Sequence, residues 1–576
     1  MKTRVLLLAF FVLAAHSLSA ADPYVGYIYP SGMQAGTTNR LVIGGQNLNR
    51  IKGVRFSRGG LKVLKIENVP NFSPPTGGQR KHLKKWLDGI AAGNPEEPPV
   101  DDPHADEWRS NSWWRALGTL DAGQLAIVES DLYTPKNALQ ATPSLRQKLL
   151  VTVAVDAGAK TGRGELCLYG PAGISAPRPF SISAGRHVAE PLYVPPHRPA
   201  SKLSPIAIPE GGLVVLDGQI LPGSTDAFPL RLAKGRRYRF KATARELQPY
   251  VGDAVPGFFN ASLTLKDEAD ASVAFADDEN RFRPDPVMDF VPESDGVYSL
   301  EIHDVLYRGR GDFVYSIEVS EGIAVRASCA PEADGVVGPG EVARKEIVVE
   351  RPGRMVLEVL ARRLGSPLDA VLTLRRTQGG PLLAMWDDVT NTVFVGTIPQ
   401  AECDPVGEFD FKEPGRYVAE VTDRTGHGGA DYFWRLEVRP PTPGFAVYST
   451  RSTLPLVNKK PLSVGFRVVR RDGFGGDVRI EFPKEVRCDG CVATSGVDVV
   501  TAQVFGNGMW IPEPRPTELF AAAEIGGVIV RTPVVPCDEY EQAFAWKHLV
   551  PAETFLVTSP GGGKRRGKRG HDAKRK

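Results

Sequence analysis

The chain has 576 residues, a length that predicts three to five domains of ordinary size. Glycine (60) and proline (48) are plentiful, and short apolar runs lie between Gly, Pro and Asp residues, a pattern typical of β-sandwiches. A hydrophobic fraction of 42% excludes a wholly disordered chain.

The net charge of +3 is distributed unevenly along the chain. Residues 564–576 hold eight Lys or Arg and one Asp, a net of +7, and Lys2 and Arg4 add +2. Removing these +7 and +2 contributions from the total of +3 leaves −6 for the rest of the chain. This distribution excludes a folded nucleic-acid-binding domain, because such a domain carries its basic residues on one face.

Residues 1–21 have the pattern of a secretory signal peptide. Lys2 and Arg4 precede the apolar run 5–15, and small residues at 19–21 form a cleavage site. No later stretch reaches about 18 consecutive apolar residues, so no transmembrane segment is expected after cleavage. The sequence thus predicts a secreted, periplasmic or cell-surface protein, with a retained N-terminal anchor as the alternative.

Residues 22–186 predict one sandwich that is split by an insertion. The entry Tyr24-Val-Gly-Tyr-Ile-Tyr-Pro-Ser-Gly32 is followed by a strand through Leu41-Val-Ile-Gly-Gly45 and a turn at Asn47-Leu48. This order resembles the IPT/TIG-type immunoglobulin-like domain. The resemblance implies a β-sandwich for this part of the chain.

The insertion, residues 72–146, contains four tryptophans and a short amphipathic helix expected at 117–130. Trp side chains bind sugars by stacking, or they pack a small domain with the indole N–H bonded. Packing is the favoured interpretation, and a sugar-binding platform is the alternative. The residues concerned are Trp86, Trp108, Trp113 and Trp114.

Two further segments carry a sharper resemblance. The first is Tyr133-Thr-Pro-Lys-Asn-Ala-Leu-Gln-Ala-Thr-Pro-Ser-Leu-Arg146, and the second is Gly173-Ile-Ser-Ala-Pro-Arg-Pro-Phe-Ser-Ile182. Together with Leu364-Gly-Ser-Pro-Leu-Asp369 they resemble a family of large secreted proteins from planctomycete-type bacteria. That family joins a split immunoglobulin-like domain to pre-peptidase C-terminal (PPC) domains, which are non-catalytic.

The expected fold class is therefore mainly β, with tandem immunoglobulin-like and PPC-like sandwiches and a small helical insertion in the first. A Pro-rich linker is expected at 187–205. Two PPC-like domains follow at 206–322 and 323–440, then a further β-sandwich at 441–560 and a disordered basic tail at 561–576.

The two PPC-like domains contain a repeated pattern of Asp pairs, a Gly turn and a Tyr. Tyr298 and Tyr417 follow these turns, which predicts a tyrosine corner, with sugar stacking as the alternative. The carboxylates predict either turn caps or ligands of Ca²⁺, the one cofactor considered. The candidate calcium ligands are Asp277, Asp278, Asp285, Asp289, Asp387, Asp388 and Asp404.

Six cysteines are few for a secreted chain of this length, and spacing does not choose among their pairings. Cys488 pairs with Cys491 in a short loop, or one of the two reaches Cys537. Cys329 and Cys403 are a further candidate pair. A zinc site is disfavoured because no pair of histidines follows the Cys-x-x-Cys motif.

The sequence contains no His-Glu-x-x-His, no Gly-x-Ser-x-Gly and no phosphate-binding loop. We therefore expect a secreted, non-catalytic modular protein that interacts with or scaffolds polymers of the cell surface or envelope. The alternatives are a carbohydrate-binding protein, with or without calcium, and a hydrolase whose catalytic residues lie far apart in sequence. The basic tail 564–576 is expected to contact an anionic polymer.

Overall fold

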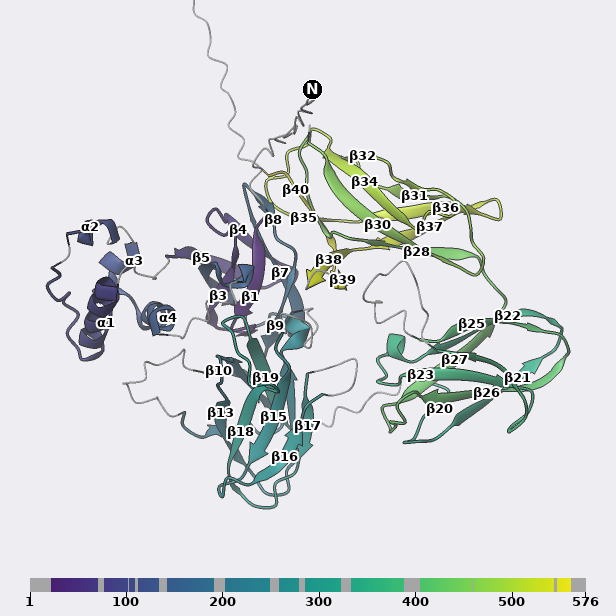
Figure 1. The fold of residues 1–576 in the computed structure, drawn as a ribbon, viewed down its shortest axis with the longest axis horizontal. Helices are drawn as coiled ribbons and strands as arrows, with labels where there is room; N and C mark the ends of the chain where they lie inside the picture. Colours follow the sequence, from purple (N-terminus) through teal and green to yellow (C-terminus); the bar gives the residue numbers. More distant parts are fainter. Residues whose placement is uncertain are drawn as a thin grey trace, which may run out of the picture.

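The computed structural model describes residues 22–70, 77–101, 103–108, 112–133, 142–190, 203–248, 258–278, 285–322, 333–387, 404–458, 460–542 and 546–560. Its described part consists of β-sandwiches in tandem and one small helical insertion (Figure 1), which confirms the expected fold class. The signal peptide and the basic tail lie outside the described residues.

The first sandwich covers residues 22–190 and has two sheets, β1-β3-β6-β5 and β2-β9-β7-β4, with β8 paired to β7. Its core holds alternate apolar residues of both sheets, among them Ile43, Val151 and Phe180. The strands are β1 (Tyr24–Tyr29), β2 (Gly32–Gln34), β3 (Thr38–Gln46), β4 (Gly53–Phe56), β5 (Leu61–Val69), β6 (Gln147–Val155), β7 (Gly162–Gly170), β8 (Gly173–Ile174) and β9 (Arg178–Ser183).

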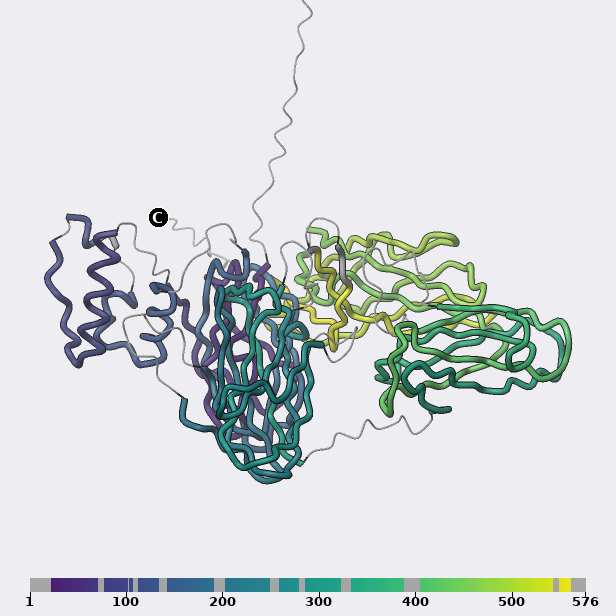
Figure 2. Tube along the Cα trace, turned by 60° about the horizontal axis from the view of Figure 1, so that its bottom comes forward, coloured from purple at the N-terminus to yellow at the C-terminus, as the bar shows by residue number. Residues whose placement is uncertain are grey.

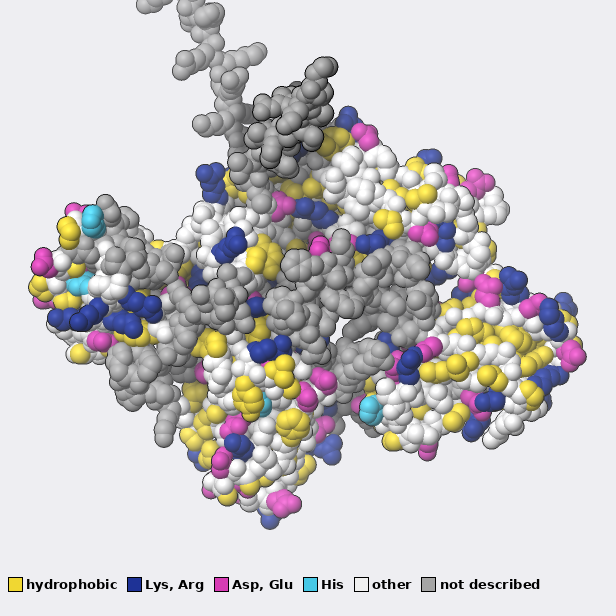
Figure 3. All heavy atoms as spheres, in the orientation of Figure 1, with side chains coloured by type: hydrophobic (Ala, Val, Ile, Leu, Met, Phe, Trp, Pro, Cys, Tyr) yellow, Lys and Arg dark blue, Asp and Glu magenta, His cyan; other side chains and the backbone are white. Residues whose placement is uncertain are grey.

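The insertion lies between β5 and β6, which remain antiparallel neighbours in one sheet. The expected helix at 117–130 is present, as a 3-10 turn followed by α4. Basic side chains gather on the insertion, at the left of Figure 3, whereas acidic and basic side chains are interspersed over the sandwiches. The helices are α1 (Gly77–Ala91), α2 (Ala105–Trp108), α3 (Ser112–Arg115), η1 (Leu117–Thr119), α4 (Ala122–Tyr133) and η3 (Pro143–Leu145).

Module 1, the first of the two domains expected to be PPC-like, covers residues 203–322 and has sheets β10-β12-β19-β14-β17 and β11-β13-β18-β15-β16. Strand β10 (Arg186–Ala189) precedes the unit in sequence but belongs to its sheet. The other elements are β11 (Ile206–Ala207), β12 (Leu213–Gln219), β13 (Asp226–Leu232), β14 (Tyr238–Thr243), η4 (Arg245–Leu247), β15 (Ala261–Lys266), β16 (Ser272–Ala276), β17 (Val287–Phe290), β18 (Gly296–Asp304) and β19 (Val314–Glu321).

Module 2, the second PPC-like unit, covers residues 333–439 and has sheets β20-β27-β22-β25 and β21-β26-β23-β24. Its eight strands match eight of the ten strands of module 1, with β26 in the place of β18 and η5 in the place of η4. Strands β10 and β11 have no counterpart among the described residues of module 2. The elements are β20 (Gly335–Val336), β21 (Ala343–Val349), β22 (Gly353–Leu360), η5 (Arg362–Leu364), β23 (Ala370–Arg375), β24 (Leu382–Trp386), β25 (Val406–Phe411), β26 (Gly415–Asp423) and β27 (Phe433–Arg439).

Both modules contain the expected tyrosine corner. The Tyr298 hydroxyl donates to the carbonyl of Ser294 at 3.1 Å, and the Tyr417 hydroxyl donates to the carbonyl of Glu413 at 2.8 Å. Each phenol thus ties the turn before its strand to the strand itself, with the ring buried in the core.

The C-terminal sandwich covers residues 444–560. It has an eight-stranded sheet, β32-β34-β30-β28-β37-β36-β31-β33, a three-stranded sheet, β29-β40-β35, and the hairpin β38-β39. The strands are β28 (Gly444–Ser449), β29 (Thr453–Pro455), β30 (Leu462–Arg471), β31 (Val478–Glu481), β32 (Val486–Asp489), β33 (Val492–Ala493), β34 (Val499–Gly506), β35 (Arg515–Thr517), β36 (Phe520–Ile525), β37 (Val528–Val535), β38 (Cys537–Gln542), β39 (Trp546–Pro551) and β40 (Phe555–Thr558).

Cys488 and Cys491 form a disulfide across the turn between β32 and β33. Cys537 is buried and free, so the alternative pairing with Cys537 is wrong. Cys329 and Cys403 lie outside the described residues. In the described part of the chain, no helix has both the length and the apolar character needed to cross a membrane.

We expect Tyr417→Phe to lower the free energy of unfolding of module 2 by about 0.5–1.5 kcal/mol, because the substitution removes one hydrogen bond and leaves the packing intact. Urea denaturation of the wild type and the variant measures the difference. Tyr432→Phe serves as the control, since the Tyr432 ring is only partly buried against the core. An equal loss in both variants would contradict the role of the corner.

Candidate functional site

The first sandwich and module 1 share a sheet. Strand β10 leaves the first sandwich and pairs in parallel with β12 of module 1, from Arg186 opposite Val214 to Ala189 opposite Asp217. The sequence predicted a linker here, at 187–205. Residues 187–189 instead belong to β10, an edge strand of the sheet of module 1, so backbone hydrogen bonds fix the start of this segment. Residues 191–202 lie outside the described part of the chain.

An apolar cluster adds to this junction. It joins Tyr27 and Tyr29 of β1 to Leu247 of η4 and Val314 of β19. The Tyr29 hydroxyl also donates to the carbonyl of Glu190 at 3.1 Å. The two units therefore bury apolar surface against each other as well as sharing backbone bonds.

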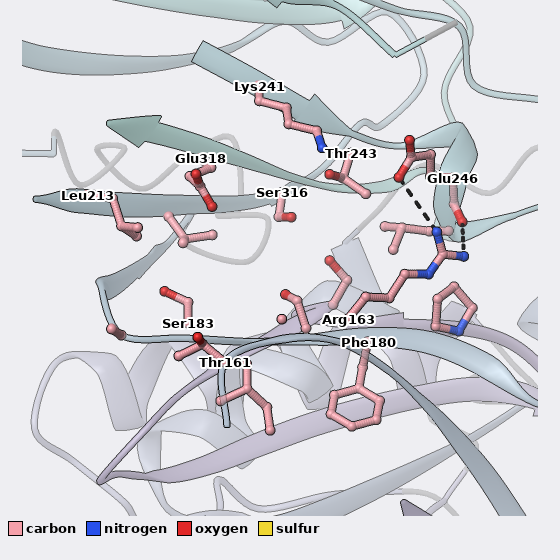
Figure 4. Close-up of a pocket in the computed structure, with 18 residues that line it drawn as sticks. Thr161, Arg163, Phe180, Ser183, Leu213, Lys241, Thr243, Glu246, Ser316 and Glu318 are labelled. Atoms are coloured by element: carbon pink, nitrogen blue, oxygen red, sulfur yellow. Dashed lines mark hydrogen bonds and ion pairs between the residues drawn. The ribbon is translucent and has the colours of Figure 1, made fainter. Parts of the chain in front are cut away.

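A cleft of about 450 Å³ opens beside this contact, with the first sandwich on one side and module 1 on the other (Figure 4). Figure 4 shows Lys241, Thr243, Ser316 and Glu318 on the side of module 1, with Thr161, Phe180 and Ser183 facing them. The hydroxyl-bearing residues of the lining are Ser31, Thr161, Ser181, Ser183, Thr243 and Ser316.

Charged residues of opposite sign frame the cleft. Arg163 lies 3.6 Å from Glu246 across the junction and also donates to its carbonyl at 3.4 Å. Lys241 and Glu318 stand opposite each other on neighbouring strands. Ser31 is 3% exposed, and its hydroxyl has no hydrogen-bond partner among the described residues. The lining therefore suits a neutral ligand that carries many hydroxyl groups.

A carboxyl pair lies behind the cleft, where β10 ends. Asp226 of β13 accepts a hydrogen bond from the Tyr315 hydroxyl at 2.7 Å, and it shares a second bond with Glu190. Burial raises the pKa of both carboxyls, and the charge of Asp226 raises the pKa of Glu190 further. Glu190 is thus the group that holds the proton of the pair at neutral pH.

A second polar pair locks the same strands. Nδ1 of His187 on β10 lies 2.6 Å from a carboxylate oxygen of Asp217 on β12, and Asp217 is fully buried. Burial raises the pKa of Asp217, and the bond to His187 opposes that rise. The pair joins neighbouring strands of the shared sheet, so it depends on the register of β10.

The opposite side of the first sandwich contacts the C-terminal sandwich. Asp22 forms an ion pair with Arg451, which lies 429 positions further along the chain. The buried Arg178 guanidinium stacks over Tyr24 at 5.7 Å and over Tyr540 of β38 at 5.0 Å. Its Nε also donates to the carbonyl of Val25 at 2.7 Å.

Apolar and polar contacts extend this second junction. Cys167 and Ile174 of the first sandwich pack on Leu556 of β40. The backbone N–H of Glu553 donates to the Glu165 carboxylate at 3.0 Å, and burial raises the pKa of Glu165 to about 7. In Figures 1 and 2 the first sandwich lies next to module 1 and to the C-terminal sandwich, and module 2 lies beside the C-terminal sandwich at the right.

Two of the candidate calcium ligands cap backbone turns. Asp285 accepts from the N–H groups of Ala244, Arg245 and Glu246 at 2.7–3.0 Å, which are the first residues of η4 and the residue before it. Asp404 accepts in the same way from Ala361, Arg362 and Arg363 at 2.9–3.3 Å. Turn capping, the alternative to calcium binding, therefore describes both carboxylates.

The other candidates are dispersed. Asp289 pairs with Arg239 at 3.2 Å, and Asp387 forms an ion pair with Arg424. Asp277 and Asp278 follow β16, and Asp388 lies outside the described residues. Among the residues that the structure describes, no group of three or more His, Cys, Asp or Glu side chains has the arrangement of a metal site.

The tryptophans of the insertion form its core. Trp86, Trp113 and Trp114 are 4%, 7% and 2% exposed, and they pack with Leu83 and Val128. The Trp86 indole donates to the carbonyl of Pro95 at 3.0 Å. Trp108 ends α2, and its side chain lies outside the described residues. Stacking on a sugar needs an exposed ring face, which the three described rings do not offer.

Sequence analysis did not find the junction residues, because they lie on different units. His187 and Glu190 lie in the expected linker, and Asp226 lies within the expected domain 206–322. Two carboxyl groups as far apart in the sequence as Glu190 and Asp226 form no recognisable sequence motif. The one available signal was the alternation of His187, Val188 and Ala189, which is too short to define a strand.

Comparison with known proteins adds little to these observations. No protein-family model matches the chain, and no curated protein matches it. Among solved structures, the D1–D4 ectodomain fragment of ICAM-5 is 11% identical, with 91% of this chain and 98% of that chain covered and a TM-score of 0.11. A TM-score this low carries no structural correspondence, so the resemblance to PPC proteins depends on sequence motifs alone.

We expect Asp285→Ala to lower the free energy of unfolding by about 2–4 kcal/mol, because three backbone N–H groups lose their acceptor. Asp289→Ala, which removes an exposed ion pair, should cost about 0–1 kcal/mol. Denaturation in EDTA and in Ca²⁺ should give the same two values. A loss that is confined to the Ca²⁺ samples would indicate that Asp285 binds the metal.

The carboxyl pair predicts a pH dependence of stability. Glu190 has a raised pKa in the folded protein, so the folded state binds more protons than the unfolded state. Its contribution is complete below the ordinary pKa of 4.5 and is lost as the pH rises. Glu190→Gln stays neutral, so its melting temperature should fall less than that of the wild type between about pH 5 and about pH 8.

Differential scanning calorimetry at the two pH values measures this effect. Glu318→Gln is the control, because this carboxylate lies exposed at the cleft and has no place in the buried pair. Equal changes in the wild type and in Glu190→Gln would show that the pair does not hold a proton.

Proposed function

We propose that the protein is a non-catalytic modular scaffold of the cell surface or envelope, which presents its PPC-like modules to surface polymers. The observation that carries the proposal is the pair of junctions on the first sandwich. A shared sheet joins it to module 1, and the contacts around Arg178 join it to the C-terminal sandwich. Such fixed geometry favours a role in presenting surfaces at defined spacing.

The absence of catalytic motifs from the sequence supports a binding role. The chain contains no His-Glu-x-x-His, no Gly-x-Ser-x-Gly and no phosphate-binding loop. The secretory signal in residues 1–21 supports a location beyond the inner membrane. The basic tail 564–576 supports a further contact with an anionic polymer, which salt should weaken.

Carbohydrate binding is the second candidate function, and the interdomain cleft favours it. The lining carries six hydroxyl side chains, among them Ser31, whose buried oxygen has no partner among the described residues. Polyhydroxylic ligands exchange hydrogen bonds with such groups. In this form of the proposal, the scaffold binds surface polysaccharide at the junction of its units.

The proposal predicts that chain 22–576 is retained on purified cell envelopes without degrading them. Chain 22–560, which lacks the basic tail, should still be retained at high salt, where the contribution of the tail is screened. Arg178→Ala, which loosens the second junction, should weaken retention by about tenfold or more, because separate units lose avidity.

Sedimentation with envelopes, followed by protein and sugar analysis of the supernatant, measures both binding and degradation. Arg479→Ala is the control, since Arg479 is exposed on β31. Release of sugars would identify an enzyme, and loss of all retention without the tail would show that the folded units do not bind.

A further inference from the structure

The loop after β18 of module 1 has a counterpart after β26 of module 2, and the two have the same backbone bonds. The Asp304 carboxylate accepts from the N–H groups of Leu306 and Arg308, both at 3.1 Å. In module 2, Asp423 accepts from Thr425 at 2.9 Å and from His427 at 3.0 Å. The carboxylate therefore fixes the same loop in both modules.

The central residue of the loop has a left-handed backbone in both modules. It is Tyr307, with φ of 52°, in module 1 and Gly426, with φ of 77°, in module 2. Its carbonyl accepts from Gly223 at 3.2 Å in one module and from Gly340 at 2.9 Å in the other. The equivalent bonds show that the backbone, and not the side chain, sets this conformation.

Tyr307 is an unusual residue for this position. Among the described residues, the other non-glycine positions with positive φ are Asn47, Asp270 and Asp472, whose short polar side chains tolerate it. A tyrosine there has a conformational cost, and module 2 shows that the loop forms with glycine. Strain of this kind is concentrated at functional sites.

The Tyr307 ring is exposed and held flat. It stacks on the His303 imidazole with ring centres 4.5 Å apart and an angle of 21° between the planes. The residue is 57% exposed, and Leu306 beside it is 65% exposed. Burial lowers the pKa of His303, so the imidazole beneath the ring is neutral at neutral pH. One face of the phenol lies on His303, and the other faces solvent.

Polar groups surround the ring on the same outer face of the sheet. His303 stands opposite Ser262 on β15, whose hydroxyl lies 3.3 Å from the imidazole. Asp277 acts on the charge state of His303 and has one carboxylate oxygen without a hydrogen-bond partner among the described residues. The exposed ring of Phe275 follows two residues further along the sheet, opposite Thr264.

Nearby charges are paired. Arg308 binds the Asp304 carboxylate at 2.9 Å, and Lys266 binds Glu301 at 3.0 Å. Among the described residues, the cations near Tyr307 are therefore neutralised and offer no excess positive charge that would attract an anionic polymer. A flat apolar ring with hydroxyl, imidazole and carboxylate groups at its edge complements a molecule with an apolar face and hydroxyl groups around it.

We propose that Tyr307 is the stacking platform of a binding site for a neutral sugar ring of a surface polysaccharide, with His303 and Asp277 as hydrogen-bonding groups at its edge. The inference rests on the proposed function, since it names the ligand class of one module. The C–H groups on one face of a pyranose lie against the phenol, and equatorial hydroxyls reach the polar side chains.

A sugar fits this surface better than a protein partner does. Protein-binding hot spots lie in a contiguous apolar surface that is dehydrated on binding. Here the two exposed aromatic residues, Tyr307 and Phe275, are separated by the partly exposed Thr264 and the buried Ser262, which lie on the strand between them. Alternation of apolar and hydroxyl groups is the pattern that an extended glycan presents.

The experiment uses chain 22–576 in native gels that contain a soluble neutral glucan, a neutral mannan, polygalacturonate or gelatin. Three variants are compared with the wild type. Tyr307→Gly introduces the residue of module 2, Tyr307→Phe keeps the ring, and Leu382→Ser removes an exposed apolar residue, 54% exposed, from module 2.

We expect retardation of the wild type by a neutral glycan. Tyr307→Gly should lower the association constant for the glycan by about fivefold or more. Its melting temperature should stay equal or rise, because the substitution relieves the backbone strain. Tyr307→Phe should keep at least about half of the affinity, since stacking needs only the ring. Leu382→Ser should bind as the wild type does.

Other results overturn the inference. Retardation by polygalacturonate or gelatin alone would identify an anionic polymer or a protein as the ligand. A lower melting temperature of Tyr307→Gly would show that the ring stabilises the fold. Retention on whole envelopes without retardation by a neutral glycan would sink this inference and leave the proposed function standing, whereas loss of both would end the proposed function as well.

Discussion

The structure depends on the parallel pairing of β10 with β12. This pairing makes the segment that follows the first sandwich an edge strand of module 1, so backbone hydrogen bonds fix where the chain leaves the first sandwich. The His187–Asp217 pair and the Glu190–Asp226 pair both form only in this register. The cleft and its hydroxyl groups exist because the two units are held at that distance.

Comparison of the two modules distinguishes the residues that the fold requires from the positions where the side chain can vary. Asp285 and Asp404 cap the same turn, and the two tyrosine corners fix the turn before β18 and the turn before β26. These groups satisfy buried backbone donors and acceptors, so their loss has an energetic cost in either module. The side chain at the tip of the loop after β18 or β26 satisfies no buried backbone group, and at this position the two modules differ.

The sequence was sufficient for the fold class, for the repeat and for the tyrosine corners. These features depend on local alternation and turn residues, which a single sequence displays. The sequence was insufficient to predict β10, because its four residues form a strand only through pairing with β12. The hairpin β38-β39 was missed as well, although its Tyr540 contributes to the junction with Arg178. Contacts between units produce no periodic pattern of apolar residues in the sequence, so a single sequence does not predict them.

The two modules share part of their surface, so a difference in function must come from the positions where they differ. At the outer face of each second sheet, Thr264 and Thr373 occupy equivalent positions, next to Glu301 and Glu420, and an exposed apolar residue follows on the edge strand, Phe275 or Met385. This row is common to both modules, so it does not distinguish them. The loop does distinguish them, with a ring in a left-handed position in one module and glycine in the other. The pair beneath the loop differs as well, with Ser262 and His303 in module 1 and Val371 and Thr422 in module 2. The backbone of the loop is the same in both modules, so the fold does not require a tyrosine at this position. Selection for a surface contact then explains why a strained, exposed tyrosine is kept there.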